Sequence, residues 1–275
     1  MSYICPICKN TLALNAWGNA YRCENNHSFD LAKDGYVNLL PVQKKHSKDP
    51  GDTKEMIGAR HEFLASGFYD QMAENLVETI QSTILDSQGK RILDLGCGEG
   101  FYSRQLKVGI SDSEQIELHG LDIAKDAIIL ASKKQKDSKF VVASSNDLPF
   151  PDHYFDLVYR VYAPSNDSEL FRVIKPSGHL LIVTPGPRHL WQLKEMIYEE
   201  AREHNSEGIE PTGFKQVKSL QKSYTIKPDQ ELRMSLLQMT PFAWQTTEKV
   251  KKEIYDKDNF EIEVDFIFSL YQKLS

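Results

Sequence analysis

The sequence has no long apolar run and no N-terminal stretch with the character of a signal peptide. None of its segments reaches the roughly 18 apolar residues that a membrane-spanning helix needs, and MSYICPICKN carries neither a basic flank nor an apolar core. These absences argue against a membrane partner and predict a cytoplasmic protein. Cysteine is also scarce, with 4 residues in 275. Because the cytoplasm is reducing, clustered cysteines indicate metal binding or chemistry rather than disulfides.

Excess positive charge is absent as well. The net charge of -6 at pH 7 argues against a protein that coats nucleic acid by bulk attraction. Residues 1–48 nevertheless hold six Lys and Arg against three acids, a balance of +3 that leaves -9 for the rest of the chain. Any surface that faces a polyanion is therefore expected at the N-terminal end.

Three of the four cysteines are present near the N-terminus. Cys5 and Cys8 form a C-x2-C pair, and Cys23 with His27 forms a C-x3-H pair further along. A segment of about 30 residues cannot bury enough surface to fold alone, and two such pairs can complete a zinc tetrahedron. The pattern predicts one structural Zn²⁺ whose binding stabilises the fold of this module. The alternative is a set of free buried thiols beside a surface histidine.

From residue 91 the sequence alternates between patterns typical of strands and of helices. Such alternation predicts an α/β fold with a mostly parallel sheet covered on both faces. The expected strands, seven in all, are 91–96, 116–123, 139–145, 155–163, 178–185, 222–228 and 260–273, and the expected helices include 101–109, 125–135, 167–174, 188–201, 229–239 and 246–255.

A glycine-rich turn follows the first of these strands, in RILDLGCGEGFYS. Glycines between a strand and a helix let the backbone approach a ligand closely, with the free N–H groups of the helix start turned toward it. Asp122 ends the next strand, where an acid can accept hydrogen bonds from ribose hydroxyls. The spacing G-x-G-x-G departs from the dinucleotide fingerprint G-x-G-x-x-G, which counts against NAD or FAD. A structural alternative is a tight core turn with no ligand.

The glycine turn, the acid after the second strand and SSNDLPFPDHYFDLV together resemble the class I S-adenosylmethionine-dependent methyltransferases. The resemblance implies a Rossmann-like methyltransferase domain. It also implies that the glycine turn packs against the methionyl part of the cofactor, the acid holds the ribose, and the Ser145–Asn146 region lies along the adenine. The residues implied by position are Asp94, Gly96, Gly98, Glu99, Gly100, Asp122 and Asn146.

Nearly the whole chain resembles the RlmA family of 23S ribosomal RNA guanine-N1 methyltransferases. The zinc spacing, FDLAKDGYVNLLP, DPGDTKEM, LDLGCGEG, RVYAP, TPGPRHL and LLQMTPFAW carry this resemblance. It implies methylation of guanine N1 in a hairpin of domain II of 23S rRNA. The Gram-negative type is favoured over the tylosin-resistance type, which modifies a neighbouring guanine. It also implies cofactor contacts from Tyr69 and His189 and makes a homodimer plausible.

The expected organisation is a β-rich zinc module that recognises RNA at 1–35, a connector at 36–56 and the methyltransferase domain at 57–275. Aromatic and basic side chains of the zinc module are expected to meet RNA. They are Tyr3, Trp17, Tyr21, Phe29, Lys9, Arg22 and Lys33.

The catalytic group is not identified by any motif. Guanine N1 carries a proton that must leave before or during methyl transfer. Tyr162 is a candidate to stack on the base, and Arg160 to contact O6 or a phosphate, although either can instead pack within its strand. His189 is a candidate base only if the cofactor does not occupy it.

Two other functions stay open at this point. One is a methyltransferase that acts on another RNA or on a small metabolite, although the zinc module argues against a metabolite. The other is a non-catalytic RNA-binding protein with a zinc module and a decayed cofactor site, which the intact Asp94, glycine turn and Asp122 disfavour.

Overall fold

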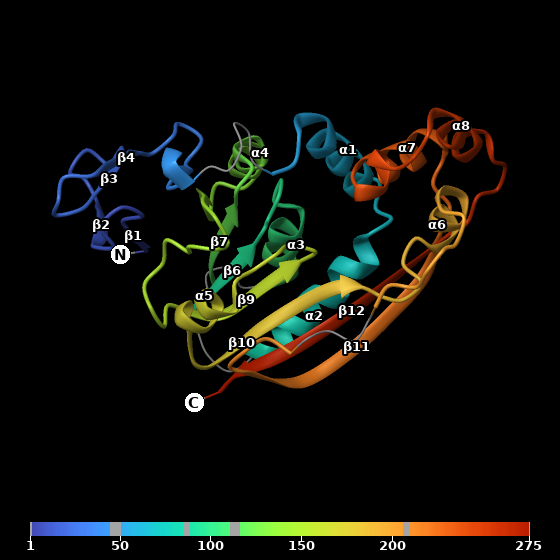
Figure 1. The fold of residues 1–275 in the computed structure, drawn as a ribbon. Helices are drawn as coiled ribbons and strands as arrows, with labels where there is room; N and C mark the ends of the chain where they lie inside the picture. The colour runs from blue at the N-terminus through green and yellow to red at the C-terminus, as the bar shows by residue number, and fades with distance from the viewer. Residues whose placement is uncertain (1, 45–50, 85–88, 111–115, 206–209, 275) are drawn as a thin grey trace.

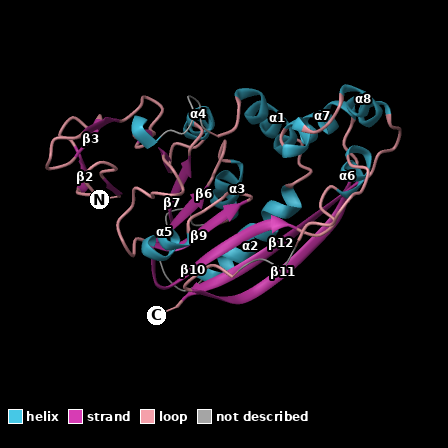
Figure 2. Cartoon of the chain, in the orientation of Figure 1, coloured by secondary structure: helices cyan, strands magenta, loops and turns pink. Residues whose placement is uncertain are grey.

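The computed structural model describes residues 2–44, 51–84, 89–110, 116–205 and 210–274. Two sheets organise this part of the chain (Figures 1 and 2). The smaller sheet is antiparallel, with its strands in sequence order. Its strands are β1 (Tyr3–Ile4), β2 (Thr11–Leu14), β3 (Ala20–Arg22) and β4 (Ser28–Asp30).

The larger sheet has the order β11-β12-β10-β9-β6-β7-β8-β5. Neighbours from β5 to β10 are parallel, and β12 and β11 add antiparallel at the other edge. The strands are β5 (Val37–Asn38), β6 (Lys90–Leu95), β7 (Ile116–Asp122), β8 (Lys139–Val142), β9 (Phe155–Val161), β10 (Ile174–Pro185), β11 (Phe214–Ile226) and β12 (Ile262–Lys273).

Helices cover both faces of the larger sheet. Alternate residues of β6 show the two sides, because Ile92 packs in the cluster that contains α2 and α3, whereas Leu93 packs with α5. In Figure 1, α1, α7 and α8 group at the far end of β11 and β12 from the C-terminus. The helices are α1 (Lys54–Ala65), α2 (Asp70–Ile84), α3 (Phe101–Gly109), α4 (Lys125–Lys134), α5 (Asp167–Val173), α6 (Trp191–Ile197), α7 (Gln230–Gln238) and α8 (Glu248–Asp256), with 3-10 turns η1 (Val42–Lys44) and η3 (Pro241–Trp244).

The prediction of an α/β fold with a mostly parallel sheet is confirmed, but the described sheet has eight strands where seven were expected. The additional strand is β5, which pairs in parallel with β8. Val37 and Leu39 are buried, so burial of these apolar side chains stabilises the pairing of this segment with the sheet. Part of the expected connector 36–56 therefore belongs to the larger sheet, while its residues 45–50 lie outside the described residues. No helix in the described ranges is both long enough and apolar enough to cross a membrane.

The zinc module and the larger sheet share one hydrophobic core. Tyr3, Cys5 and Leu12 belong to the same buried cluster as Leu148 and Phe150, which precede β9. This shared core fixes the small module against the α5 side of the sheet.

Candidate active site and metal centre

Two similar turns present the four predicted metal ligands. In the first, the Lys9 backbone N–H donates to the Cys5 carbonyl at 2.9 Å, and Lys9 has a φ of 64°. In the second, the Asn26 backbone N–H donates to the Cys23 carbonyl at 2.9 Å, and Asn26 has a φ of 62°. In each turn the left-handed residue reverses the chain so that both ligands point to the same side.

The four ligand atoms have the spacing of a tetrahedral zinc site. The side-chain nitrogen and sulfur atoms of Cys5, Cys8, Cys23 and His27 all lie within 4.8 Å of one another. The Cys8 and Cys23 sulfurs are 3.6 Å apart, and His27 Nδ1 is 3.5 Å from the Cys5 sulfur. Zinc bonds of about 2.3 Å to sulfur and about 2.0 Å to nitrogen require edges of about 3.8 and 3.5 Å. The residues therefore fit a structural Zn²⁺, and a hydrogen bond from the Asn10 backbone lowers the pKa of Cys8 to about 6, which favours the thiolate.

All three glycines of the predicted cofactor turn have left-handed backbones. Their φ angles are 75° at Gly96, 54° at Gly98 and 80° at Gly100. A Cβ at Gly96 would lie 2.3 Å from the Cβ of Ala163, so this glycine lets the turn pack against the end of β9. A Cβ at Gly98 would meet no atom within 4 Å, so the turn is open there. The turn can thus receive a ligand at Gly98.

Asp122 joins the end of β7 to this turn. Its Oδ2 accepts the Gly98 backbone N–H at 2.8 Å, and its Oδ1 accepts the Ala124 N–H at 2.8 Å. Burial raises the pKa of this carboxyl above its usual range. Since each carboxylate oxygen accepts more than one hydrogen bond, Asp122 has capacity left for hydroxyl donors.

Asp94 and Glu99 have their carboxylates occupied by protein groups. Asp94 accepts from the Ser103 hydroxyl at 2.7 Å, which ties the end of β6 to the first turn of α3, and burial raises its pKa to about 7. Glu99 pairs with both oxygens to Arg104, at 2.7 and 3.0 Å, and His61 lies 3.4 Å away. The Glu99 carboxylate therefore holds the rim of the turn together.

Three predicted aromatic residues lie together at the carboxyl ends of β9 and β10. The ring centroid of His189 lies 5.7 Å from that of Tyr162 and 6.4 Å from that of Tyr69. Tyr69 is buried, and its hydroxyl has no hydrogen-bond partner within the described ranges. A buried orphan hydroxyl is costly unless a ligand satisfies it. This hydroxyl and the open turn at Gly98 both fit a polar cofactor.

His189 is neutral in this environment. Its Nδ1 accepts the Asp265 backbone N–H at 3.1 Å, which leaves the proton on Nε2. Burial, followed by the neighbouring His204, lowers its pKa to about 3. With one nitrogen engaged and the other protonated, His189 is poorly suited to accept a proton from guanine.

Tyr162 and Arg160 point to different surroundings. Tyr162 has a φ of 56° and remains 42% exposed, so its ring is available beside His189. Arg160 donates from Nη1 to the Ala163 carbonyl, and its buried Nε has no partner within the described part of the chain. Arg160 therefore holds the turn after β9.

Asn146 is exposed in the loop after β8, with its backbone N–H donating to Ser144 Oγ at 3.2 Å.

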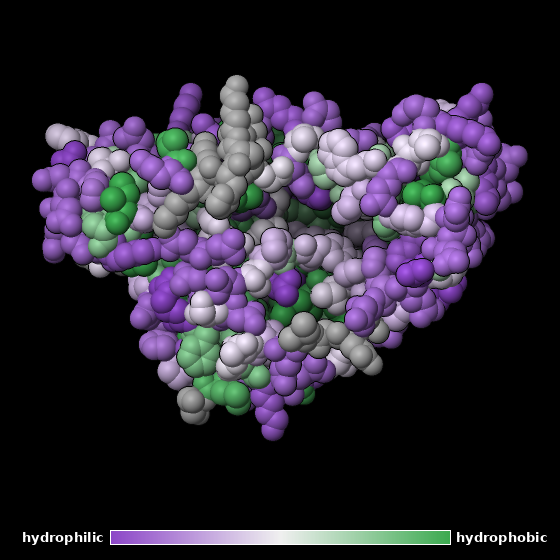
Figure 3. Space-filling view, in the orientation of Figure 1, coloured by the Kyte–Doolittle hydropathy of each residue, from purple (hydrophilic) through white to green (hydrophobic). Residues whose placement is uncertain are grey.

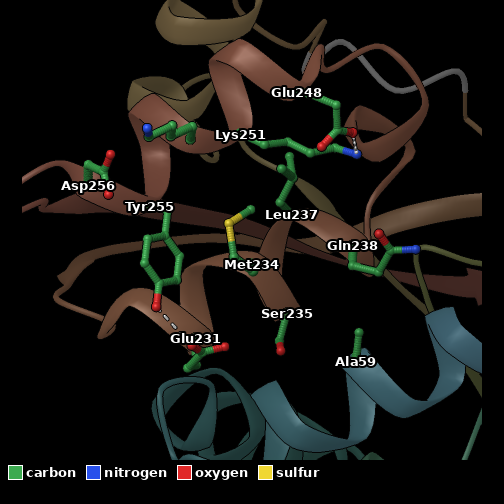
Figure 4. Close-up of a pocket in the computed structure, with 11 residues that line it drawn as sticks. Ala59, Glu231, Met234, Ser235, Leu237, Gln238, Glu248, Lys251, Tyr255 and Asp256 are labelled. Atoms are coloured by element: carbon green, nitrogen blue, oxygen red, sulfur yellow. Dashed lines mark hydrogen bonds and ion pairs between the residues drawn. The ribbon is translucent and has the colours of Figure 1, made fainter.

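The face shown in Figure 3 is hollowed between the zinc module and the α7–α8 end, with hydrophobic residues inside the hollow. A separate groove of 710 Å³ lies between α1, α7 and α8, and Met234, Leu237 and Tyr255 line it (Figure 4). None of the predicted site residues is among the described residues that line this groove.

Sequence reasoning missed Asp265, whose backbone N–H fixes the His189 ring and whose carboxylate is held by other groups. The Gln221 amide donates to both Asp265 oxygens, at 2.9 and 3.0 Å. A Cβ at Gly186 would lie 2.2 Å from the same carboxylate, so only glycine fits above it. No local pattern in the sequence marks a contact between β12 and the loop after β10.

Comparisons with known proteins agree with this geometry. Residues 3–48 match the family model of the RlmA N-terminal zinc ribbon, and residues 86–239 match a methyltransferase domain. The chain is 30% identical to YxjB of Bacillus subtilis (strain 168), a proposed 23S rRNA (guanine-N1)-methyltransferase, over 95% of this chain and 93% of that one. It is also 30% identical to the 23S rRNA (guanine(748)-N1)-methyltransferase of Streptomyces fradiae, over 87% of this chain and 85% of that one. The crystal structure of YcgJ from Bacillus subtilis covers 74% of this chain with a TM-score of 0.50 and 16% identity, which shows the shared fold.

The sheet order, the open glycine turn and the matched domain define a class I S-adenosylmethionine-dependent methyltransferase. With the zinc ribbon and the two relatives matched over most of their length, the chain belongs to the RlmA family. The predicted resemblance is thus confirmed, as are S-adenosylmethionine as cofactor and a zinc site of three cysteines and a histidine. The individual cofactor contacts stay predictions.

Proposed function

We propose that this chain transfers a methyl group from S-adenosylmethionine to N1 of a guanine in a hairpin of domain II of 23S rRNA. The observation that carries the proposal is the match to the Bacillus subtilis and Streptomyces fradiae relatives over zinc module and catalytic domain alike. A metabolite methyltransferase needs no zinc ribbon, and a decayed cofactor site would not keep the open turn at Gly98.

The cofactor supplies a sulfonium methyl group, and this chain supplies binding and alignment. In our proposal the methionyl part lies against Gly96, Gly98 and Gly100, and Asp122 accepts from the ribose hydroxyls. Asn146 borders the adenine, while Tyr69 and His189 close the side toward β10. Glu99 contributes through its backbone, because Arg104 occupies its carboxylate.

The target base is proposed to enter beside Tyr162. The Tyr162 ring is exposed at the carboxyl end of β9, where class I sheets bind their ligands. Stacking on this ring would orient the guanine so that N1 faces the methyl group in line. Arg160 acts as a positioning residue, since it holds the Ala163 carbonyl at the base of the same turn.

Fewer residues of the zinc module are available to contact RNA than the sequence indicates. Tyr3 is only 2% exposed, and Lys9 pairs with Asp147 of the catalytic domain. Trp17 is 83% exposed at the tip of the β2–β3 hairpin, and Arg22 and Lys33 are exposed as well. We propose that Trp17 stacks on an unpaired base while Arg22 and Lys33 meet phosphates.

The finer assignments belong to the same proposal. We infer the Gram-negative type of target guanine, a cytoplasmic location beside the ribosomal RNA, no membrane partner and a homodimer. The division into a zinc module at 1–35, a connector at 36–56 and a catalytic domain at 57–275 also stays our proposal, with β5 as the part of the connector that the catalytic sheet holds.

Mass mapping of 23S rRNA from cells with and without this chain tests the reaction and the position together. We expect one N1-methylguanine in the domain II hairpin that disappears with the gene and returns when the purified protein and S-adenosylmethionine are added. An unchanged 23S rRNA map would overturn the proposal. Calorimetric titration with S-adenosylmethionine would then distinguish a methyltransferase with another substrate from a non-catalytic RNA-binding protein, because a decayed cofactor site would bind no S-adenosylmethionine.

A further inference from the structure

The zinc module contacts the catalytic domain through residues beside its metal ligands. Tyr3 is buried, with its ring 5.5 Å from that of Phe150 and 6.1 Å from that of His119. The Ile4 backbone N–H donates to the Pro149 carbonyl at 3.0 Å. Lys9 forms an ion pair with Asp147. Since Ile4 adjoins Cys5 and Lys9 adjoins Cys8, both polar contacts originate within one residue of a ligand.

Three of these partners, Asp147, Pro149 and Phe150, lie in one short segment of the catalytic domain, whereas His119 lies on β7. Residues 147–150 follow Asn146 directly, and we call residues 143–150 the adenine-side segment. Its first residue, Ala143, donates from its backbone N–H to the Asp122 carbonyl at 3.0 Å. Near its other end, the Leu148 N–H donates to Glu169 of α5 at 2.7 Å. The segment is therefore held by β7 at one end and by α5 and the zinc module at the other.

The contact residues Ile4 and Lys9 belong to the turn that presents the metal ligands Cys5 and Cys8. The first turn of the module orders Ile4 and Lys9 by the hydrogen bonds from Cys5 N to Asn10 and from Lys9 N to Cys5, at 2.7 and 2.9 Å. A module with so little core depends on bound metal for its fold. Without zinc this turn would relax, and the contacts to Asp147 and Pro149 would loosen with it.

We propose that the zinc module positions the adenine-side segment, so that Zn²⁺ and S-adenosylmethionine bind this chain cooperatively. The inference rests on the cofactor placement proposed above. It assigns the module a part in building the cofactor pocket, separate from any contact with RNA, and makes Lys9 and Asp147 positioning residues. Binding linkage is reciprocal, so each ligand strengthens the other by the same factor.

The first experiment is calorimetric titration of S-adenosylmethionine into zinc-loaded protein without RNA. Lys9→Met and Asp147→Asn are each expected to weaken binding by about two- to fivefold, the range that an exposed ion pair can contribute. The double variant should be no weaker than the more affected single variant, because both remove one interaction. Zinc content and melting temperature are measured for each variant.

Lys136→Met is the matched control. Lys136 pairs with Asp34, another contact between the N-terminal region and the catalytic domain, at 3.8 Å. The exposed side-chain fractions are 61% and 32% for this pair and 52% and 25% for Lys9 and Asp147. Ala32 and Tyr36, which flank Asp34, pack in a different hydrophobic cluster from Leu148 and Phe150. Loss of the Lys136 pair should therefore leave cofactor affinity unchanged.

The second experiment measures zinc directly. Saturating S-adenosylmethionine should raise the chelator concentration that removes half of the zinc, and Lys9→Met should reduce this shift. Hydrogen exchange of the peptide covering 143–150 should rise when zinc is removed. The inference would be overturned if cofactor affinity were unchanged in Lys9→Met and Asp147→Asn and if S-adenosylmethionine did not change the chelator concentration that removes half of the zinc. A wild-type protein that binds no cofactor would instead overturn the proposed function.

Discussion

Asp122 Oδ2 accepts the Gly98 backbone N–H at 2.8 Å, which makes the end of β7 and the glycine turn one unit. The hydrogen bond holds Gly98 at a φ of 54°, with open space where a Cβ would lie. The same carboxylate proposed to hold the ribose thereby also shapes the surface proposed to meet the methionyl part of the cofactor.

Gly98→Ala and Gly96→Ala should therefore behave differently. Alanine at 98 costs about 1 kcal/mol of backbone strain but meets no neighbour, so the variant should fold and lose cofactor affinity. Alanine at 96 would place its Cβ 2.3 Å from that of Ala163 and should lower the melting temperature by several degrees more. Thermal unfolding and calorimetry measure both effects. Normal cofactor binding by Gly98→Ala would contradict the open turn as the ligand surface.

The parts of this site that the sequence predicted are those set by local spacing. Cys5, Cys8, Cys23 and His27 could be assigned because two closely spaced ligand pairs occur in a segment too short to fold without a metal. The glycine turn could be assigned because it lies between an evident strand and an evident helix. Tyr69 and His189 carry no local signal, and only the family resemblance pointed to them.

Contacts between distant segments could not be predicted. His189 and Asp265 are 76 residues apart, and their hydrogen bond depends on the register of β12 beside β10. Tyr3 and Lys9 were expected to face RNA because the residue types suit it, yet the two-residue strand β1 turns Tyr3 into the shared core. In a short strand, the presence of an aromatic residue does not reveal whether its side chain faces solvent or a neighbouring domain.

The buried, neutral His189 should make folding stability depend on pH. Its pKa is about 3 in the folded chain and about 6.5 when unfolded, so the unfolded state binds more protons between these values. Stability from this residue is therefore fully present above about pH 6.5 and falls by about 2 kcal/mol as the pH drops to 5. Urea unfolding of the wild type and of His189→Asn at both pH values isolates this loss, since the other titrating groups are common to both. Equal pH dependence in the two proteins would contradict a neutral His189.

Trp17→Ala should weaken binding to the hairpin RNA without changing zinc content or cofactor affinity. The Asn15 side chain accepts the Asn19 backbone N–H at 3.1 Å and so orders the hairpin that presents Trp17. Stacking of one base contributes about 1–3 kcal/mol, which corresponds to a loss of about 5- to 160-fold in affinity. Fluorescence anisotropy with a labelled hairpin measures it. Trp244→Ala is the matched variant, because Trp244 is 71% exposed in η3, which contacts α7 at the end of the molecule opposite β1–β4 (Figure 1). A loss confined to Trp244→Ala would place the RNA on the α7–α8 end instead.

Tyr162 gives the sharpest test of where the base enters. The residue has a left-handed backbone, and its N–H donates to the Val183 carbonyl at 3.1 Å. This hydrogen bond to β10 fixes the position of the Tyr162 backbone and so the point from which its side chain extends. Tyr162→Ala should lower kcat by about 10- to 100-fold at saturating RNA while the cofactor Kd stays within about twofold, because a poorly oriented base rarely reaches the in-line geometry. Tyr162→Phe keeps the stacking face and should retain most of the turnover. If Tyr162→Phe lost as much activity as Tyr162→Ala, the hydroxyl rather than the ring face would be the important group. Unchanged turnover in Tyr162→Ala would place the target base elsewhere along the carboxyl edge of the sheet.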